Sequence, residues 1–290
     1  MEEEILKKAE VLMESFPYIR EFKNKIFVIK VGGSIFRIPE AKQNILQDIA
    51  FLEIVDIKTI LICGGGPFIT EEIEKRGKKT KFIDGLRVTD EKTIEIVKEV
   101  LFGVRDEIVN YLKKKLKVKA APLLPEEKFM IAKKIHYQKG EEVIDLGFVG
   151  QVKDVNVEYI EKKLNEEKIL VVSPLAYSEE GIIYNINGDA VASSIAEKMK
   201  ATKLIFLTDV PGVMRNPENP ETLISGLEVN QAKELISKGI IKEGMVPKVK
   251  SAISAINKGV EKVHIISGNI PHSILLEIFT EQGIGTEIKK

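Results

Sequence analysis

A lysine lies directly before two glycines at the end of a predicted strand, in the segment FVIKVGGSIF (residues 27–36). In the common phosphate-binding loop the glycines come first, and the lysine follows them where a helix begins. Here Lys30 precedes Gly32 and Gly33. Glycines after a strand let a ligand approach the backbone closely, and free N–H groups there attract anions. The segment is therefore a candidate phosphate site of a different design.

A second glycine cluster, Gly64-Gly65-Gly66 followed by Pro67, comes after the apolar run KTILIC. Ligands of open α/β sheets bind at the carboxyl ends of the strands, so two clusters in this position strengthen the case for a ligand site. Neither cluster has the G-x-G-x-x-G spacing of dinucleotide-binding proteins. The sequence thus disfavours a hydride-transfer enzyme.

An arginine stands near the start of a long predicted helix, in DGLRVTDEKT (residues 84–93). Thr89 or Asp90 could cap this helix, which explains those two residues structurally. A cap does not account for Arg87, whose planar guanidinium suits a carboxylate. Arg87 is therefore a candidate for binding an acidic ligand.

Polar residues gather before a helix in YNINGDAVA (residues 184–192). Asn185 and Asn187 are two positions apart on an extended segment, so their side chains should point to the same side. They could form a polar wall for a small ligand or only a polar strand end. Asp189 is a candidate N-cap of the following helix, and that role alone would explain it.

Two further segments in the second half could contact a ligand. LTDVPGVM (residues 207–214) ends a strand in an acidic residue and a Pro-Gly turn. A helix is predicted to begin after Gly244, with Lys248 in or near its first turn. A lysine there opposes the helix dipole, although surface lysines often occupy such positions.

Strand-like and helix-like segments alternate along most of the chain, which predicts βαβ units and a largely parallel sheet. An amphipathic helix is predicted over residues 3–22, because Ile5, Ala9, Leu12 and Phe16 recur near helical spacing. Pro17 should interrupt or kink this helix. Between residues 129 and 186, short runs predict hairpins at one edge of the sheet. We expect a helix at 1–24 and two lobes, 25–176 and 177–290, that share one sheet.

Composition narrows the classes of function. The 290 residues carry no net charge, 44% of them are hydrophobic, and Cys63 is the only cysteine. No apolar run reaches transmembrane length, and the first residues are too polar for a signal peptide. We therefore expect a cytoplasmic protein that binds neither nucleic acid nor membranes.

Eight elements occur in order over nearly the whole chain: KVGGS, GGGP, GLRVTD, GFVGQV, NINGDAVA, LTDVPGV, GMVPKV and PHSILLEIFTEQGIGT. Together they resemble the amino-acid kinase family, and within it the branch that acts on N-acetyl-L-glutamate in arginine biosynthesis. The resemblance implies a three-layer αβα sandwich with a mainly parallel sheet. It also implies phosphoryl transfer from ATP, with Mg²⁺ bound through the nucleotide, to the γ-carboxylate of that substrate.

The resemblance also implies a role for each matched residue. Lys30 and Lys248 would contact the transferring phosphoryl group from opposite sides, and Asp189 would orient both ammonium groups. Arg87 would bind the α-carboxylate and Asn185 the acetylated amino acid. Backbone N–H groups around the phosphoryl group and the acceptor would come from Gly32, Gly33, Gly64 and Gly65. The nucleotide pocket would be lined by Thr208, Asp209 and Gly212.

The two ends of the chain resemble the arginine-inhibited members of this family. EVLMESFPYIREF (residues 10–22) is similar to a helical extension that joins dimers into hexamers. The resemblance implies a homo-oligomer, either a dimer or a hexamer, and inhibition by arginine. It places the arginine site near Tyr18 and residues 272–287.

Four features depart from the family pattern. Cys63 replaces a histidine, Gly188 replaces an alanine, SGNIPHS replaces an acidic-glycine-basic turn, and residues 117–129 lack a glycine-rich loop. We expect that loop to border the acceptor side, so its change leaves two alternatives open. One is a sister kinase for another N-blocked carboxylate, such as glutamate or 2-aminoadipate, perhaps carrier-bound. The other is a regulatory paralogue that does not turn over, which the intact lysines and Asp189 disfavour.

Overall fold

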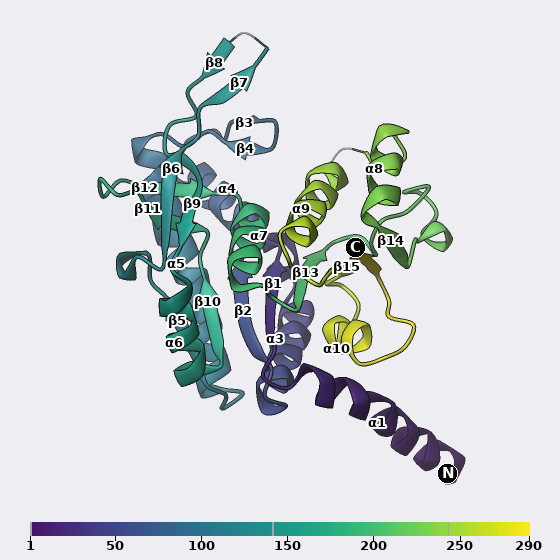
Figure 1. Cartoon of the computed structure of the whole chain (residues 1–290). Helices are drawn as coiled ribbons and strands as arrows, with labels where there is room; N and C mark the ends of the chain where they lie inside the picture. Colours follow the sequence, from purple (N-terminus) through teal and green to yellow (C-terminus); the bar gives the residue numbers. More distant parts are fainter. Residues whose placement is uncertain (1, 141, 243) are drawn as a thin grey trace.

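The structure is a computed structural model that describes residues 2–140, 142–242 and 244–290. Helix α1 (Glu2–Phe22) projects from the rest of the molecule at the N-terminus (Figure 1). It is one helix that continues through Pro17, where the sequence predicts an interruption or kink. The side chains of Ile5 and Ala9 fall outside the described part of the chain, whereas Leu12 and Phe16 of the predicted apolar stripe are exposed.

The described strands build an eight-stranded central sheet in the order β14–β16–β15–β13–β1–β2–β10–β5. From β15 to β5 all neighbours are parallel, whereas β16 is antiparallel to β15 and β14 is parallel to β16. The predicted, mainly parallel sheet is therefore confirmed. Its strands are β1 (Ile26–Val31), β2 (Lys58–Cys63), β5 (Ala120–Leu123), β10 (Ile169–Val172), β13 (Lys203–Thr208), β14 (Gly226–Glu228), β15 (Lys262–Ser267) and β16 (Thr286–Lys289).

Helices cover both faces of this sheet and make three layers (Figure 1). Successive strand residues face opposite sides, so Phe27 and Ile29 of β1 belong to the core that includes α3, α5 and α10, and Val28 belongs to the core that includes α6 to α9. Lys30 shares the side of Val28 and therefore faces α7. The remaining helices are α2 (Gly33–Phe36), α3 (Pro39–Ile54), α4 (Gly66–Lys75), α5 (Glu91–Lys114), α6 (Val157–Glu167), α7 (Gly188–Met199), α8 (Val229–Ser237), α9 (Met245–Asn257) and α10 (Ser273–Ile278).

The middle of the chain contains the predicted antiparallel hairpins, but they do not lie at the edge of the central sheet. Four of its strands close on one another as a small barrel in the order β11–β12–β9–β6, apart from the central sheet. The edge strands of the central sheet are β5 and β14 instead. The strands of the barrel and of the two separate hairpins are β3 (Phe82–Ile83), β4 (Leu86–Arg87), β6 (Met130–Lys134), β7 (Tyr137–Lys139), β8 (Glu142–Ile144), β9 (Val149–Val155), β11 (Leu175–Tyr177) and β12 (Ile183–Ile186).

The division of the chain into lobes at 25–176 and 177–290 stays a prediction. In the sheet, strands from the first and second halves of the chain meet where β1 pairs with β13. None of the helices in the described ranges has the length and apolar character needed to cross a membrane.

Candidate active site

The two glycine clusters meet at the carboxyl ends of the neighbouring strands β1 and β2. A Cβ atom on Gly33 would lie 3.1 Å from the nitrogen of Gly66, and one on Gly64 would lie 2.9 Å from the oxygen of Val31. Any side chain at either position would push the two backbone segments apart. Glycine is therefore needed for this close approach.

Lys30, Asp189 and Lys248 form one charged group at the same edge of the sheet. The Nζ atom of Lys30 lies 2.7 Å from Oδ1 of Asp189, and Nζ of Lys248 donates a hydrogen bond of 2.6 Å to Oδ2. The three side chains come from β1, α7 and α9, and they are 13%, 14% and 23% exposed in that order. A single carboxylate thus holds both ammonium groups.

The cap of helix α7 differs from the prediction. Asn187, not Asp189, is the N-cap, and its Oδ1 atom accepts hydrogen bonds from the backbone N–H groups of Asp189 and Ala190. Asp189 is the second residue of the helix, so its carboxylate is free to bind the two lysines. The prediction was wrong because Asn, Asp, Ser and Thr are all favoured caps, and sequence alone does not show which of two neighbours serves.

The lysines set the protonation state of Asp189. Burial raises the pKa of Asp189, but the charges and contacts of Lys30 and Lys248 lower it by more, so the pKa lies below its ordinary value. The carboxylate therefore stays ionised at neutral pH. Two ammonium groups and one carboxylate leave a net positive charge, which suits phosphoryl oxygens.

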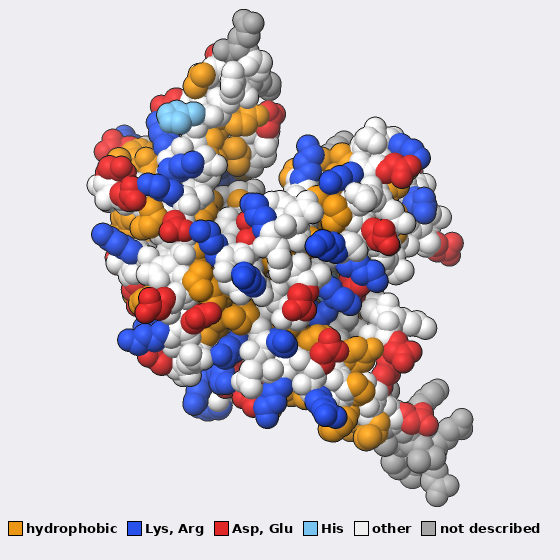
Figure 2. Space-filling model, viewed as in Figure 1, with side chains coloured by type: hydrophobic (Ala, Val, Ile, Leu, Met, Phe, Trp, Pro, Cys, Tyr) orange, Lys and Arg blue, Asp and Glu red, His pale blue; other side chains and the backbone are white. Residues whose placement is uncertain are grey.

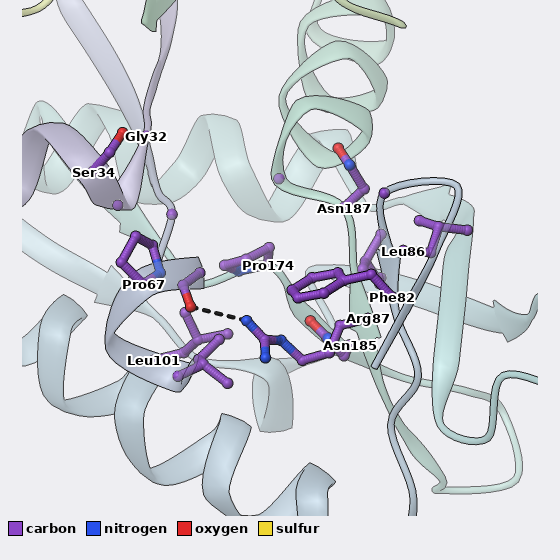
Figure 3. Close-up of a pocket in the computed structure, with 18 of the residues that line it drawn as sticks. Gly32, Ser34, Pro67, Phe82, Leu86, Arg87, Leu101, Pro174, Asn185 and Asn187 are labelled. Atoms are coloured by element: carbon purple, nitrogen blue, oxygen red, sulfur yellow. Dashed lines mark hydrogen bonds between the residues drawn. The ribbon is translucent and has the colours of Figure 1, made fainter. Parts of the chain in front are cut away.

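A cavity of about 320 Å³ opens beside Lys30, and we call it the Lys30 cavity. Its polar wall contains all the residues predicted to contact the acceptor or its phosphoryl group from this side: Gly32, Gly33, Gly64, Gly65, Arg87 and Asn185. Asn187 also lines it, so both asparagines face one side as predicted. Figure 3 shows Phe82 and Leu86 on one side of the cavity and Pro67 and Leu101 on the other.

Arg87 is buried beside this cavity and is only 7% exposed. Its Nη2 donates to the carbonyl of Gly66 and to Oγ1 of Thr70, both at 2.9 Å, and Nη1 donates to Thr80 at 3.2 Å. The guanidinium also lies 4.7 Å from the ring centroid of Phe82. Figure 3 shows it reaching across toward the Pro67 side.

The charge of Arg87 has no opposite charge beside it among the residues that the structure describes. In the described ranges, no carboxylate forms an ion pair with it, and burial lowers its pKa from the ordinary value. A buried cation without a partner is costly. Since a guanidinium has five N–H donors, donors remain for an acidic ligand in the cavity. The sequence did not reveal Thr70, Thr80 or Phe82, which hold this side chain in place.

A second and larger cavity, of about 840 Å³, opens beside Lys248, and we call it the Lys248 cavity. Thr208, Asp209 and Gly212, the residues predicted for the nucleotide pocket, line it together with Lys248. Lys30 lines the first cavity and Lys248 lines the second, so the Asp189 carboxylate joins them. Figure 2 shows the surface hollowed between the β3–β4 side and the α8 side of the molecule.

Three of the four departures from the family pattern are not part of the described lining of the Lys30 cavity. Among the described residues lining it, neither Cys63 nor any part of 117–129 occurs, so the prediction that this loop borders the acceptor side is not supported. Cys63 is buried, its thiol donates to the carbonyl of Val172, and burial raises its pKa to about 12. The SGNIPHS turn leads into α10 and also lies outside the described lining. Only Gly188 lines the cavity.

The described residues supply no set of metal ligands. None of their His, Cys, Asp and Glu side chains gather in a group of three or more that could hold a metal ion. Asp189, the carboxylate between the cavities, has an ammonium group on each oxygen.

Comparisons with known proteins show the family of this chain. The model of the amino acid kinase family matches residues 25–267. The acetylglutamate kinase of Methanocaldococcus jannaschii is 47% identical over 99% of this chain and 98% of its own length.

Solved structures with the same overall fold include a bacterial synthase. The N-acetylglutamate synthase of Neisseria gonorrhoeae, in complex with coenzyme A and N-acetyl-glutamate, superposes with a TM-score of 0.87 at 26% identity and covers 97% of this chain. The match spans 63% of that longer chain. The same synthase in complex with coenzyme A and L-arginine gives a TM-score of 0.86 at 26% identity, over 97% of this chain and 65% of its own. The family model and the near-full-length relative together show that this chain belongs to the amino acid kinase family.

Proposed function

We propose that this protein transfers the γ-phosphoryl group of ATP to the γ-carboxylate of N-acetyl-L-glutamate, the acetylglutamate kinase step of arginine biosynthesis. One observation carries the proposal. The cavity lined by Arg87 and the larger cavity beside α9 each present one lysine, and the two lysines share Asp189. A transferring group between the cavities would be contacted by an ammonium on each side.

The Lys30 cavity suits an N-acylated amino acid with two carboxylates. Arg87 would bind the α-carboxylate, because it is a buried cation that lines this cavity and forms no ion pair with the described carboxylates. Asn185 would bind the acetamido group with its side-chain amide, whose Nδ2 otherwise makes only a long contact, 3.4 Å, with Thr89 Oγ1. The γ-carboxylate would then face the glycine N–H groups and Lys30.

The reaction needs little covalent chemistry from the protein. A γ-carboxylate oxygen attacks the γ-phosphorus, the bond from that phosphorus to the β–γ bridging oxygen breaks, and ADP leaves. Both reactants are anions, so Lys30 and Lys248 offset their repulsion and stabilise the charge on the phosphoryl oxygens. Mg²⁺ bound by the nucleotide would neutralise further phosphate charge. Asp189 would keep both ammonium groups in place.

Trapping the product tests the proposal. The protein is incubated with MgATP, hydroxylamine and one acceptor at a time: N-acetyl-L-glutamate, L-glutamate, L-aspartate or N-acetyl-2-aminoadipate. We expect hydroxamate from N-acetyl-L-glutamate at the highest rate. No hydroxamate from that acceptor would refute the proposal, and a faster reaction with another acceptor would identify a sister kinase. Nucleotide binding without hydroxamate from any acceptor would indicate the regulatory paralogue.

A third cavity, of about 350 Å³, lies between α1 and the end of the chain, and we call it the α1 cavity. Tyr18 of α1 lines it, and so do several residues of the 277–287 segment. Lys203 and Lys262 face Glu277 and Glu287 there, so the wall offers both cations and carboxylates. We propose arginine as its ligand, because arginine carries a guanidinium, an ammonium and a carboxylate. Millimolar arginine should lower the rate, and an unchanged rate would refute this part.

Helix α1 also supports the proposal of a homo-oligomer. Leu12, Met13 and Phe16 are all more than half exposed on its surface. Apolar residues that gather on one helix favour contact with another chain. Light scattering should give a mass of at least two copies, and Leu12→Glu with Phe16→Glu should lower it. A monomer in the parent protein would contradict the proposal. A hexamer, and a cytoplasmic location, remain predictions.

A further inference from the structure

The segment GIGT (residues 283–286) near the end of the chain has a role that the proposed reaction does not use. Thr286 is fully buried. Its Oγ1 atom accepts a hydrogen bond of 2.8 Å from the N–H of Val213 and donates one of 2.7 Å to the carbonyl of Ile224. One hydroxyl group therefore binds two backbone groups of a different part of the chain.

Those two backbone groups lie at the base of a loop. The N–H of Ile224 donates to the carbonyl of Val213 at 2.9 Å, and Met214 pairs with Leu223. The loop between these ends lines the Lys248 cavity through residues 213, 214 and 216–218. Thr286 is not among the described residues that line the Lys248 cavity, and its hydroxyl group binds the two backbone segments at the base of this loop.

Gly212 shows how closely this loop lies against the hydroxyl group. A Cβ atom on Gly212 would be 2.6 Å from Oγ1 of Thr286. The glycine predicted for the nucleotide pocket is therefore needed for contact with Thr286.

The backbone before Thr286 is itself held firmly. Oε2 of Glu277 accepts hydrogen bonds from the N–H groups of Ile284, at 2.7 Å, and Gly285, at 2.9 Å. Gly283 has a φ of +60°, and a Cβ there would lie 2.8 Å from Oε2 of Glu277. A Cβ on Gly285 would lie 2.5 Å from the carbonyl of Ile265 in β15. The two glycines let the chain wrap around Glu277, which leaves Thr286 little freedom to move.

We infer that Thr286 is a positioning residue for the nucleotide: its hydroxyl group fixes the 213–224 loop against the Lys248 cavity. This inference rests on the proposal that the nucleotide binds in that cavity. Thr286 touches no reacting group, so it acts through the loop. Its hydroxyl, not its methyl group, carries the effect, because the hydroxyl makes both bonds to the loop.

Comparing four residues at position 286 distinguishes the effect of the hydroxyl group from that of the methyl group. The parent Thr286 and Thr286→Ser have the hydroxyl, whereas Thr286→Val and Thr286→Ala lack it. The dissociation constant of ADP is measured by calorimetry without any acceptor, and KM values for ATP and N-acetyl-L-glutamate are measured separately. We expect Val and Ala to raise the ADP constant and the ATP KM at least fivefold, Ser to stay within twofold, and the acceptor KM to stay within twofold throughout.

The controls make each outcome decisive. Thr59 is also buried, but its hydroxyl finds no hydrogen-bond partner in the described part of the chain, so Thr59→Val should leave nucleotide binding unchanged. If Thr286→Val does not fold, the Ser and Ala variants still differ only in the hydroxyl. The inference would be overturned if the ADP dissociation constants followed the presence of the methyl group rather than that of the hydroxyl group. It would also be overturned if the KM values for ATP and for the acceptor rose equally. Because ADP binding is measured without acceptor, a wrong acceptor assignment would not affect this result.

Discussion

Replacing either lysine of the charged group by methionine removes one positive charge and keeps much of the side-chain length. In Lys30→Met and in Lys248→Met, Asp189 keeps one ammonium partner, so we expect both variants to fold. Removing one partner of a buried ion pair costs about 3–5 kcal/mol when the other charge is left alone. Because one ammonium remains, we expect a smaller loss of unfolding free energy, of about 1–3 kcal/mol.

In both variants, we expect the loss of transition-state stabilisation to exceed the loss of unfolding free energy. Each ammonium is placed at 2.6–2.7 Å from the shared carboxylate and lines a different cavity. Removing a single charge-stabilising donor costs about 3–4 kcal/mol in the transition state, or about 10²–10³ in kcat. A unit charge acting over about 4 Å at an effective dielectric constant of about 20 gives about 4 kcal/mol, which agrees.

Steady-state rates of hydroxamate formation provide the assay, with KM measured for both substrates. Lys258→Met is the matched control, because Lys258 follows α9 and pairs with Glu197 at an exposed position. We expect the control to keep its kcat and the two site variants to lose it with modest changes in KM. If a folded Lys30→Met or Lys248→Met variant kept kcat within threefold of the parent, the proposed role of the charged group would be refuted.

Three further predictions test other parts of the site. Arg87→Lys keeps the charge but loses the planar guanidinium, so the KM for the acceptor should rise about 10–100-fold, which corresponds to about 1.5–3 kcal/mol of binding free energy. The KM for ATP should stay unchanged, and equal changes in both KM values would show that Arg87 does not act on the acceptor alone. Gly188→Ala adds a Cβ 3.3 Å from Cε of Lys30, which a flexible side chain can accommodate. We therefore expect kcat within threefold, and a tenfold loss would show that Lys30 needs that space. Burial raises the pKa of Asp48 to about 6 despite its contact with His272, so the folded state binds the proton more tightly than the unfolded state. The contribution of the Asp48 proton to the free energy of unfolding is complete below about pH 4 and is lost as the pH rises through about 6. Measured by urea denaturation, the free energy of unfolding of Asp48→Asn should therefore rise by up to about 3 kcal/mol relative to that of the parent between pH 4 and 7. A difference between the two proteins that does not change with pH would contradict this.

The sequence predicted the parts of the site that depend on local patterns. Strand β1 is a short apolar run, and glycines follow it directly, so the place of Lys30 at a strand end was readable from the residues. The cap of helix α5 was also readable, since Asp90 accepts a hydrogen bond from the N–H of Thr93 as expected, whereas the cap of α7 was not. The meeting of Lys30, Asp189 and Lys248 was not, because they come from three elements far apart in sequence. Only the family resemblance suggested it.

Other elements were missed for physical reasons. Strand β5 contains Pro122, which disfavours a central strand but is tolerated here because β5 is an edge strand. Helix α6 is polar and short, although Asn156 caps it. The closure of four strands into a barrel, apart from the central sheet, was missed, since alternation shows strands but not which partners close a sheet.

The central claim is that a carboxylate oxygen of N-acetyl-L-glutamate attacks the γ-phosphorus of ATP. The most direct test uses acceptor labelled with ¹⁸O in its γ-carboxylate, with hydroxylamine present to take the acyl group. Hydroxylamine attacks the acyl carbon, so phosphate should leave with one ¹⁸O atom and the hydroxamate should keep the other. We predict one ¹⁸O per phosphate released, by mass spectrometry. Phosphate without ¹⁸O would show that water, not the acceptor, had attacked, and would contradict the account.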